Sequence, residues 1–260
     1  MNPWWQLLLV WLVSAALMTL GWQWQRVRTN AGIVDVLWAA GVGGSAVLLA
    51  AIGSGAPWTR MALAVLGGAW GIRLAVHLWK RVRGEPEDGR YRNLRMHWQG
   101  DQLKFFLFFQ FQAALIVLFA LPFFAVARNP QASGPWLAAA AAIWLLSVIG
   151  ESIADAQLAR FRTDPANKGH TCRDGLWRYS RHPNYFFEWL HWFAYVCLGV
   201  GSPLGWLAWS GPLVMIVFLR WISGIPFTET QALRSRGDDY RDYQRTTSML
   251  IPWFPKRTDT

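Results

Sequence analysis

The residues of this chain that are best suited to chemistry surround a proline at the mouth of an apolar segment. Arg181 and His182 precede this proline, which lacks a backbone N–H and therefore fits the first turn of a helix. In that helix Asn184, Glu188 and Trp192 follow one another at intervals of four residues and share one face. A carboxylate inside an apolar segment is costly unless it faces a polar cavity. We therefore interpret this run as the wall of a binding site, in preference to simple helix capping.

A second group of polar residues precedes this run. Glu151, Asp155 and Arg162 lie on one face of a predicted helix, and a loop rich in hydrogen-bond donors follows. Arginine suits a phosphate through paired hydrogen bonds, and lysine does so as a point charge. The alternative interpretation is an interfacial ion-pair strip followed by a solvated connector. The donors of the loop are Asn167, Lys168, His170, Thr171 and Arg173.

Ionisable residues at helical spacing also occur nearer the N-terminus. Arg73, His77 and Arg81 follow one another at intervals of four residues, from inside an apolar segment to its end. An arginine inside such a segment is expensive unless it is paired or hydrated. Asp35, in the preceding apolar segment, is either the partner of Arg73 or a catalytic group. We predict Asp35 and Arg73 as the catalytic candidates and leave the two roles of Asp35 open.

The tail contributes further polar groups. Residues 225–243 predict an amphipathic helix, whose default position is on the membrane surface. Tyr240 and Tyr243 at its end offer phenols that can cover or contact a nucleotide.

The elements that must position these residues are helices of membrane-spanning length. Hydrophobic residues make up 53% of the 260-residue chain and are concentrated in long runs, and a helix needs about 20 such residues to cross a bilayer. The polar faces that a soluble helical core would need are missing, and the 19 Trp residues fit interfacial anchoring. We predict an all-α polytopic membrane protein with seven transmembrane helices, at 4–24, 33–53, 59–79, 105–127, 135–154, 185–201 and 203–223.

Basic residues set the expected orientation. Of the 25 Lys and Arg residues, only Arg60 and Arg128 fall on one side of this arrangement, and Arg73 lies within a span. The positive-inside rule then places the N-terminus outside and the C-terminus in the cytoplasm. The net charge of +10 is explained by this topology and by attraction to anionic lipids, so no nucleic-acid partner is required.

Several site classes find no support in the sequence. Two cysteines provide neither a disulfide framework nor a metal set, and no phosphate-binding loop or Gly-x-Gly-x-x-Gly motif follows a predicted strand. Any nucleotide must therefore bind between membrane helices and the long cytoplasmic loops that cap them. We expect one domain over residues 1–260, with its cofactor-binding part at about 150–260.

At these residues the chain resembles the steroid 5-alpha reductase family, in its bacterial branch. The Arg-His-Pro-x-Tyr core is the less specific part, because isoprenylcysteine carboxyl methyltransferases and sterol reductases have similar cores. The resembling segments are Glu85–Tyr91, Glu151–Arg162, Asp174–Glu188, Ile225–Glu229 and Asp239–Tyr243.

The resemblance implies an enzyme of a bacterial inner membrane that binds NADPH from the cytoplasm and reduces the Δ4 double bond of a 3-oxo-steroid or another lipophilic enone. The sequence does not indicate an oligomeric state. Together with the patterns above, the resemblance predicts cofactor contacts at Arg73, His77, Glu151, Asp155, Arg162, Lys168, His170, Arg173, Tyr179, Arg181, His182, Asn184, Tyr185, Glu188, Trp192, Glu229, Tyr240 and Tyr243.

The implied reaction is hydride addition to the β-carbon of the enone, during which negative charge builds on the carbonyl oxygen. A hydrogen-bond donor at that oxygen lowers the barrier. Eukaryotic members of the family hold the 3-oxo group with a Glu and a Tyr, and the nearest positions in this chain are Asp35 and Trp70. An Asp that stays protonated in an apolar span can act as the donor, so Asp35 is the candidate.

Two alternatives remain open. One is a membrane methyltransferase that uses S-adenosylmethionine, and the other is a lipid-binding or sterol-binding protein without enzymatic activity. The phosphates of NADPH demand several cations and the methyl donor has none, so the basic residues around 162–181 favour NADPH.

Overall fold

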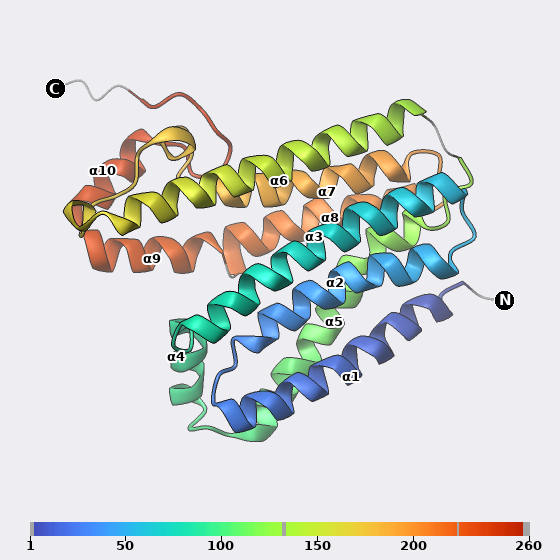
Figure 1. Cartoon of the computed structure of the whole chain (residues 1–260), viewed down its shortest axis with the longest axis horizontal. Coiled ribbons are helices and arrows are strands. Elements are labelled where there is room, and N and C mark those ends of the chain that lie inside the picture. Colours follow the sequence, from blue (N-terminus) through green and yellow to red (C-terminus); the bar gives the residue numbers. More distant parts are fainter. Residues whose placement is uncertain (1–2, 132–133, 223, 257–260) are drawn as a thin grey trace. The chain divides into compact units, whose positions relative to one another are not determined.

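The computed structural model describes residues 3–131, 134–222 and 224–256, and every regular element in these ranges is a helix (Figure 1). This confirms the predicted all-α class. The longer helices are α1 (Trp5–Arg28), α2 (Ile33–Ile52), α3 (Pro57–Gly84), α4 (Gly89–His97), α5 (Gln102–Val126), α6 (Gly134–Thr163), α7 (Pro183–Gly199), α8 (Ser210–Val217), α9 (Ile225–Arg236) and α10 (Asp238–Thr246). The short helical turns are η1 (Pro165–Asn167), η2 (Gly175–Arg178), η3 (Gly205–Trp209) and η4 (Phe218–Ile222).

Within the part of the chain that the structure describes, six stretches are long and apolar enough to cross a membrane, and they indicate an integral membrane protein, as predicted. They are Trp5–Arg28, Ile33–Ile52, Pro57–Gly84, Gln102–Val126, Gly134–Thr163 and Gly205–Arg236.

The predicted span at 185–201 corresponds to α7, which is not among the six. This helix has 17 residues. At 1.5 Å per residue it is about 25 Å long, slightly shorter than the hydrocarbon core of about 30 Å. The finer predictions, seven spans and an N-terminus outside, therefore stay predictions.

The chain forms two compact units. Residues 1–137 and 195–210 make up the first unit, and residues 138–194 and 211–260 make up the second. Whether the two act as the single domain that we predicted stays open to experiment.

In the first unit, α2 and α3 pack backbone to backbone. A Cβ atom added at Gly71 would lie 2.5 Å from the Cα atom of Gly43, and one added at Gly43 would lie 2.7 Å from the Cα atom of Gly71. Small residues at a crossing between membrane helices allow this approach, which strengthens dispersion contacts in a lipid environment. The pair fixes the position of α2 and hence of Asp35 in its first turn.

In the second unit, the connection between α6 and α7 is fastened to α6. The indole of Trp177 donates a hydrogen bond to the Ala154 carbonyl at 2.9 Å, and Gln157 accepts one from the Leu176 amide at 2.9 Å. Further along, Phe187 fills the space beside Gly150, where no Cβ atom would fit. These contacts hold the start of α7 against α6.

The glycine crossing generates a prediction. Gly71→Ala forces α2 and α3 apart and costs about 1–3 kcal/mol, the usual range for overpacking. Gly44→Ala is the matched control, because nothing lies within 4 Å of a Cβ atom there and alanine favours the helix. Thermal unfolding in detergent will show a lower midpoint for Gly71→Ala alone. Equal midpoints for the two variants would contradict the close crossing.

Candidate functional site

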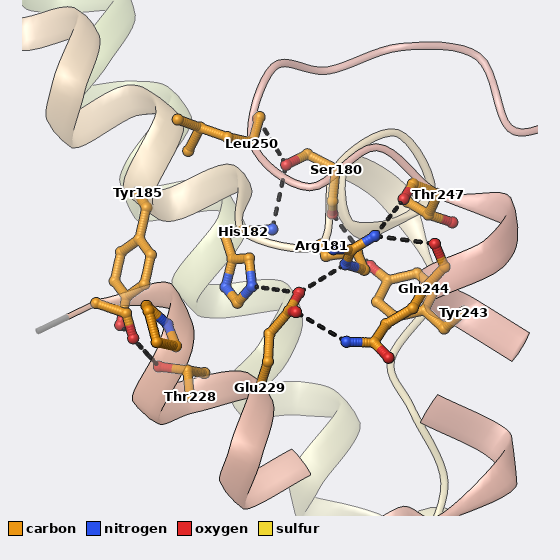
Figure 2. A network of polar contacts seen from close by, with 12 residues as sticks. Ser180, Arg181, His182, Tyr185, Thr228, Glu229, Tyr243, Gln244, Thr247 and Leu250 are labelled. Atoms are coloured by element: carbon orange, nitrogen blue, oxygen red, sulfur yellow. Dashed lines mark hydrogen bonds and ion pairs between the residues drawn. The ribbon is translucent and has the colours of Figure 1, made fainter. Parts of the chain in front are cut away.

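Glu229 of α9 is the centre of a polar network in the second unit (Figure 2). Its Oε1 atom accepts a hydrogen bond from Arg181 Nε at 2.7 Å and lies 3.2 Å from His182 Nε2. Its Oε2 atom accepts one from Gln244 Nε2 at 2.8 Å. The side chains of Arg181 and Glu229 are only 11% and 15% exposed, so water screens this ion pair weakly.

The Arg181 guanidinium also holds the end of α10. Its Nη1 atom donates to the backbone carbonyls of Gln244 at 3.0 Å and Thr247 at 2.8 Å. The Arg181 amide donates to the Ser248 carbonyl at 2.8 Å. Arg181, which directly precedes His182 before α7, therefore connects both α9 and α10 to the rest of the second unit (Figure 2).

His182 is buried beside this pair and stacks on Tyr185, with ring centroids 5.4 Å apart. Burial lowers the pKa of His182 below its ordinary value, although the neighbouring Glu229 carboxylate opposes the shift. The imidazole is therefore neutral at pH 7, and its contact with a carboxylate oxygen puts the proton on Nε2. His182 thus acts as a second donor to Glu229.

Two buried tyrosines complete the network. Tyr240 donates to Glu229 Oε1 at 3.4 Å, and Tyr243 donates to the Ser180 carbonyl at 3.1 Å and to the Trp177 carbonyl. Burial is the main cause that raises the pKa of both phenols, so they stay protonated and donate. Their hydroxyl groups thus bind protein atoms, and their predicted contact with a nucleotide stays a prediction.

A cavity of about 370 Å³ lies where α6 ends and the following loop begins. Its walls include Arg162, Lys168 and His170, three of the predicted cofactor residues. Arg236, at the end of α9, adds a cation that the sequence did not predict. Figure 1 shows α9 beside the loop that follows α6. The fold thus gathers basic side chains from three segments around one space.

The chemistry of this cavity suits an anion. Asp164 is the acidic residue in its wall, and its Oδ1 atom accepts a hydrogen bond from the Ala166 amide at 2.9 Å. Cys172 also lines the cavity, and burial raises the pKa of its thiol, which therefore stays protonated at neutral pH. In the described part of the chain no group of His, Cys, Asp or Glu residues could hold a metal ion. Among the charged residues of the wall, Arg162, Lys168 and Arg236 therefore outnumber the carboxylate of Asp164.

Other predicted cofactor residues of the second unit lie outside this wall. Asn184 Nδ2 donates to Asp155 Oδ1 at 3.3 Å, which joins α7 to α6. Arg173 Nη2 donates to the Asp239 carbonyl at 2.7 Å and so attaches the loop to α10. The remaining members in this unit are Glu151, Tyr179, Tyr185, Glu188 and Trp192.

In the first unit, Asp35 lies beside two residues of α4. Tyr91 donates its hydroxyl proton to Asp35 Oδ1 at 2.6 Å, and Arg90 Nη2 donates to Oδ2 at 3.2 Å. A cavity of about 20 Å³ adjoins Asp35, which is room for one water-sized group. Arg73 and His77, also predicted site residues, lie in α3 of this unit.

Helix α4 is placed by its own N-cap. Asp88 accepts a hydrogen bond from the Arg90 amide at 2.9 Å and pairs with Arg81 Nη2 at 2.6 Å. Burial raises the pKa of Asp88, but the bonds and charges of Arg90 and Arg81 outweigh it and lower the pKa. Burial, and then the Asp35 carboxylate, raises the pKa of Tyr91 well above its ordinary value, so the phenol keeps its proton.

Sequence reasoning missed the partners that the fold brings from a distance. Tyr91 and Arg90 are part of a segment that carries the family resemblance, and this was the available signal for them. Arg236 and Gln244 had no such signal, because their roles depend on how α9 and α10 return to the loop.

Removing the Glu229 carboxylate will destabilise the packing of residues 225–250. Glu229→Ala leaves Arg181 without its acidic partner in a poorly hydrated place, which typically costs about 3–5 kcal/mol. Asp242→Ala is the control, because its ion pair with Arg245 is 56% and 72% exposed and such pairs contribute about 0–1 kcal/mol. Hydrogen exchange over residues 225–250 will accelerate strongly for Glu229→Ala only. Similar exchange in both variants would show that the network does not hold the tail.

Comparison with known proteins gives the family. The chain matches the model of a family described as Protein of unknown function (DUF1295) over residues 21–247. It is 28% identical over 182 residues to Uncharacterized protein C594.04c of Schizosaccharomyces pombe, an alignment that covers 58% of this chain and 53% of that protein. The chain thus spans about half the length of this curated relative. No solved structure matches the present chain. Because the family model covers most of the chain, including Asp35, the cavity and the Glu229 network, this protein belongs to the DUF1295 family.

Proposed function

We propose that this protein is a membrane reductase of the steroid 5-alpha reductase type, which uses NADPH to reduce the C=C bond of an enone lipid such as a 3-oxo-steroid. The observation that supports it best is the cationic cavity at the end of α6. The motifs at Glu151–Arg162 and Asp174–Glu188, which resemble that family, flank or overlap this region of the second unit.

The cavity fits the phosphate-bearing end of a dinucleotide. Its volume of about 370 Å³ lies within the range of about 300–1,000 Å³ that is typical of ligand sites. Arg162 and Arg236 can each grip phosphate oxygens with paired N–H groups, and Lys168 adds a point charge. S-adenosylmethionine has no phosphate to use these cations, so the cavity favours NADPH over the methyl donor.

In this proposal the protein binds the cofactor through the second unit. Arg162, Lys168 and Arg236 would hold a phosphate, and His170 would donate a further hydrogen bond. Asp155 and Asn184, which already contact each other at 3.3 Å, offer polar atoms for ribose or amide groups. The bound cofactor would supply the hydride for the β-carbon, and a proton from water would complete the reduction at the α-carbon.

The residues around Asp35 would act on the substrate carbonyl. Hydride addition to the β-carbon leaves negative charge on the carbonyl oxygen, and a fixed donor at that oxygen stabilises the transition state. Tyr91 keeps its proton and donates it to Asp35 at 2.6 Å, so the phenol is the member of this pair that could turn its hydrogen bond to the substrate oxygen, while Asp35 positions it. The adjoining space for one water-sized group suits such an oxygen.

Ligand-induced stabilisation tests the choice of cofactor. Detergent-purified protein will show a higher unfolding midpoint with NADPH and no change with S-adenosylmethionine. Arg162→Ala combined with Lys168→Ala will weaken NADPH binding at least about tenfold, because charge-assisted hydrogen bonds are worth about 1.5–3 kcal/mol each. Arg160→Ala, an exposed residue of the same helix outside the cavity, will bind NADPH normally. Stabilisation by the methyl donor alone would overturn the proposal in favour of a methyltransferase.

Turnover tests the role of the carbonyl-binding pair. Tyr91→Phe will lower the rate of enone reduction by about 10²–10³, the loss expected for one oxyanion donor. Asp35→Asn, which changes the group that positions the phenol, will also lower the rate, while NADPH affinity stays unchanged in both variants. Asp101→Asn is the control, because Asp101 is the N-cap of α5 and asparagine is also a favourable N-cap residue. We expect this variant to reduce the enone at the normal rate. Rates near those of the unmodified protein in both variants would remove Asp35 and Tyr91 from the mechanism.

A further inference from the structure

Four apolar or aromatic side chains form an exposed patch on the second unit. Ile251, Trp253 and Phe254 are 57%, 70% and 75% exposed, and Tyr179 is 37% exposed. The Phe254 ring lies 6.1 Å from that of Tyr179 and 6.5 Å from that of Trp253, between centroids. Grouped exposed apolar side chains mark an interaction site, whereas isolated ones do not.

The backbone of this patch is fixed by hydrogen bonds. The Trp253 amide donates to the Tyr179 carbonyl at 2.9 Å, and the Lys256 amide donates to the Thr246 carbonyl at 2.8 Å. Ser180 Oγ donates to the Leu250 carbonyl at 2.7 Å. The segment after α10 is therefore held in one conformation that presents the aromatic rings outward.

The position of the patch along α6 indicates its depth in the membrane. Trp177, two residues before Tyr179, donates its indole N–H to the Ala154 carbonyl of α6 at 2.9 Å. Counted from Gly134, Ala154 lies about 30 Å along α6 at 1.5 Å per residue. The hydrocarbon core of a bilayer is also about 30 Å thick. The patch thus lies at the level where the apolar part of α6 ends.

Exposed basic residues flank the patch. Arg178 precedes Tyr179, and Lys256 follows Phe254 by two residues. Tyr and Trp concentrate at the boundary between lipid and water, where their rings are apolar and their polar atoms remain hydrated. Lys and Arg at the cytoplasmic surface attract anionic headgroups. Both kinds of side chain thus match one occupant, the headgroup region of an anionic bilayer.

We propose that Tyr179, Ile251, Trp253 and Phe254 form an interfacial anchor that inserts into the headgroup region of the surrounding membrane, with Arg178 and Lys256 on anionic lipid. This anchor is separate from the spanning helices. It attaches the segment after α10, and through Tyr179 the approach to α7, to the bilayer surface.

Depth-dependent quenching tests the anchor in the full-length chain. A fluorescent label is attached at Phe254→Cys in a Cys172→Ala, Cys197→Ala background, and the protein is reconstituted in nanodiscs of phosphatidylcholine and phosphatidylglycerol. Asp238→Cys, at an exposed position of α10, is the matched control. We expect lipids that carry a spin label near the headgroup to quench the label at 254 several-fold more than the label at 238. Iodide in the water will quench the label at 254 less.

A second label at Ile251→Cys keeps the test decisive if the first variant does not fold. Equal quenching by lipid at 238 and at both patch positions would overturn the proposal. Protection from iodide at the patch without quenching by lipid would also overturn it, because a protein surface and not lipid would then cover the rings.

Discussion

The ion pair between Glu229 and Arg181 is the interaction on which the candidate site depends. Both side chains are largely buried, and a charge in such a place is costly unless it is paired and hydrogen-bonded. Glu229 meets this condition with donors from Arg181, His182 and Gln244. These residues come from the approach to α7 and from α10, so one carboxylate joins three segments. The cavity depends on this junction, because α9 contributes both Glu229 and Arg236.

Polar contacts, more than apolar ones, hold α9 and α10 in place. The apolar contact of α9 with α10 is small and involves Ala232, Tyr240 and Tyr243, with Leu233 packed against them. So few side chains bury too little area to fix the tail by the hydrophobic effect alone. Hydrogen bonds to one carboxylate specify a single arrangement, and this arrangement places Arg236 in the wall of the cavity. The aromatic segment after α10 is held by separate hydrogen bonds, from the Trp253 amide to Tyr179 and from the Lys256 amide to Thr246.

Much of the fold could be predicted from composition, because long apolar runs dictate membrane helices. Arg162, Lys168 and His170 were predicted together since they are close in sequence and a single loop can gather them. Arg236 was missed, because only the folded arrangement brings the end of α9 to the loop that follows α6. Tyr91 was missed as the partner of Asp35, because α4 is short and polar and lacks the apolar periodicity from which a helix is predicted. The predicted span at 185–201 has the same length as α7, but the helix begins and ends two residues earlier, at Pro183 and Gly199.

The affinity of the protein for NADPH compared with NADH tests the central claim most directly, because the two molecules differ only in the 2′-phosphate that the cationic cavity would bind. Equilibrium titration of the detergent-purified protein should give at least about a tenfold preference for NADPH, which corresponds to about 1.4 kcal/mol. Arg236→Gln should reduce this preference while leaving NADH affinity unchanged. Equal affinity of the unmodified protein for the two dinucleotides would contradict the assignment of the cavity.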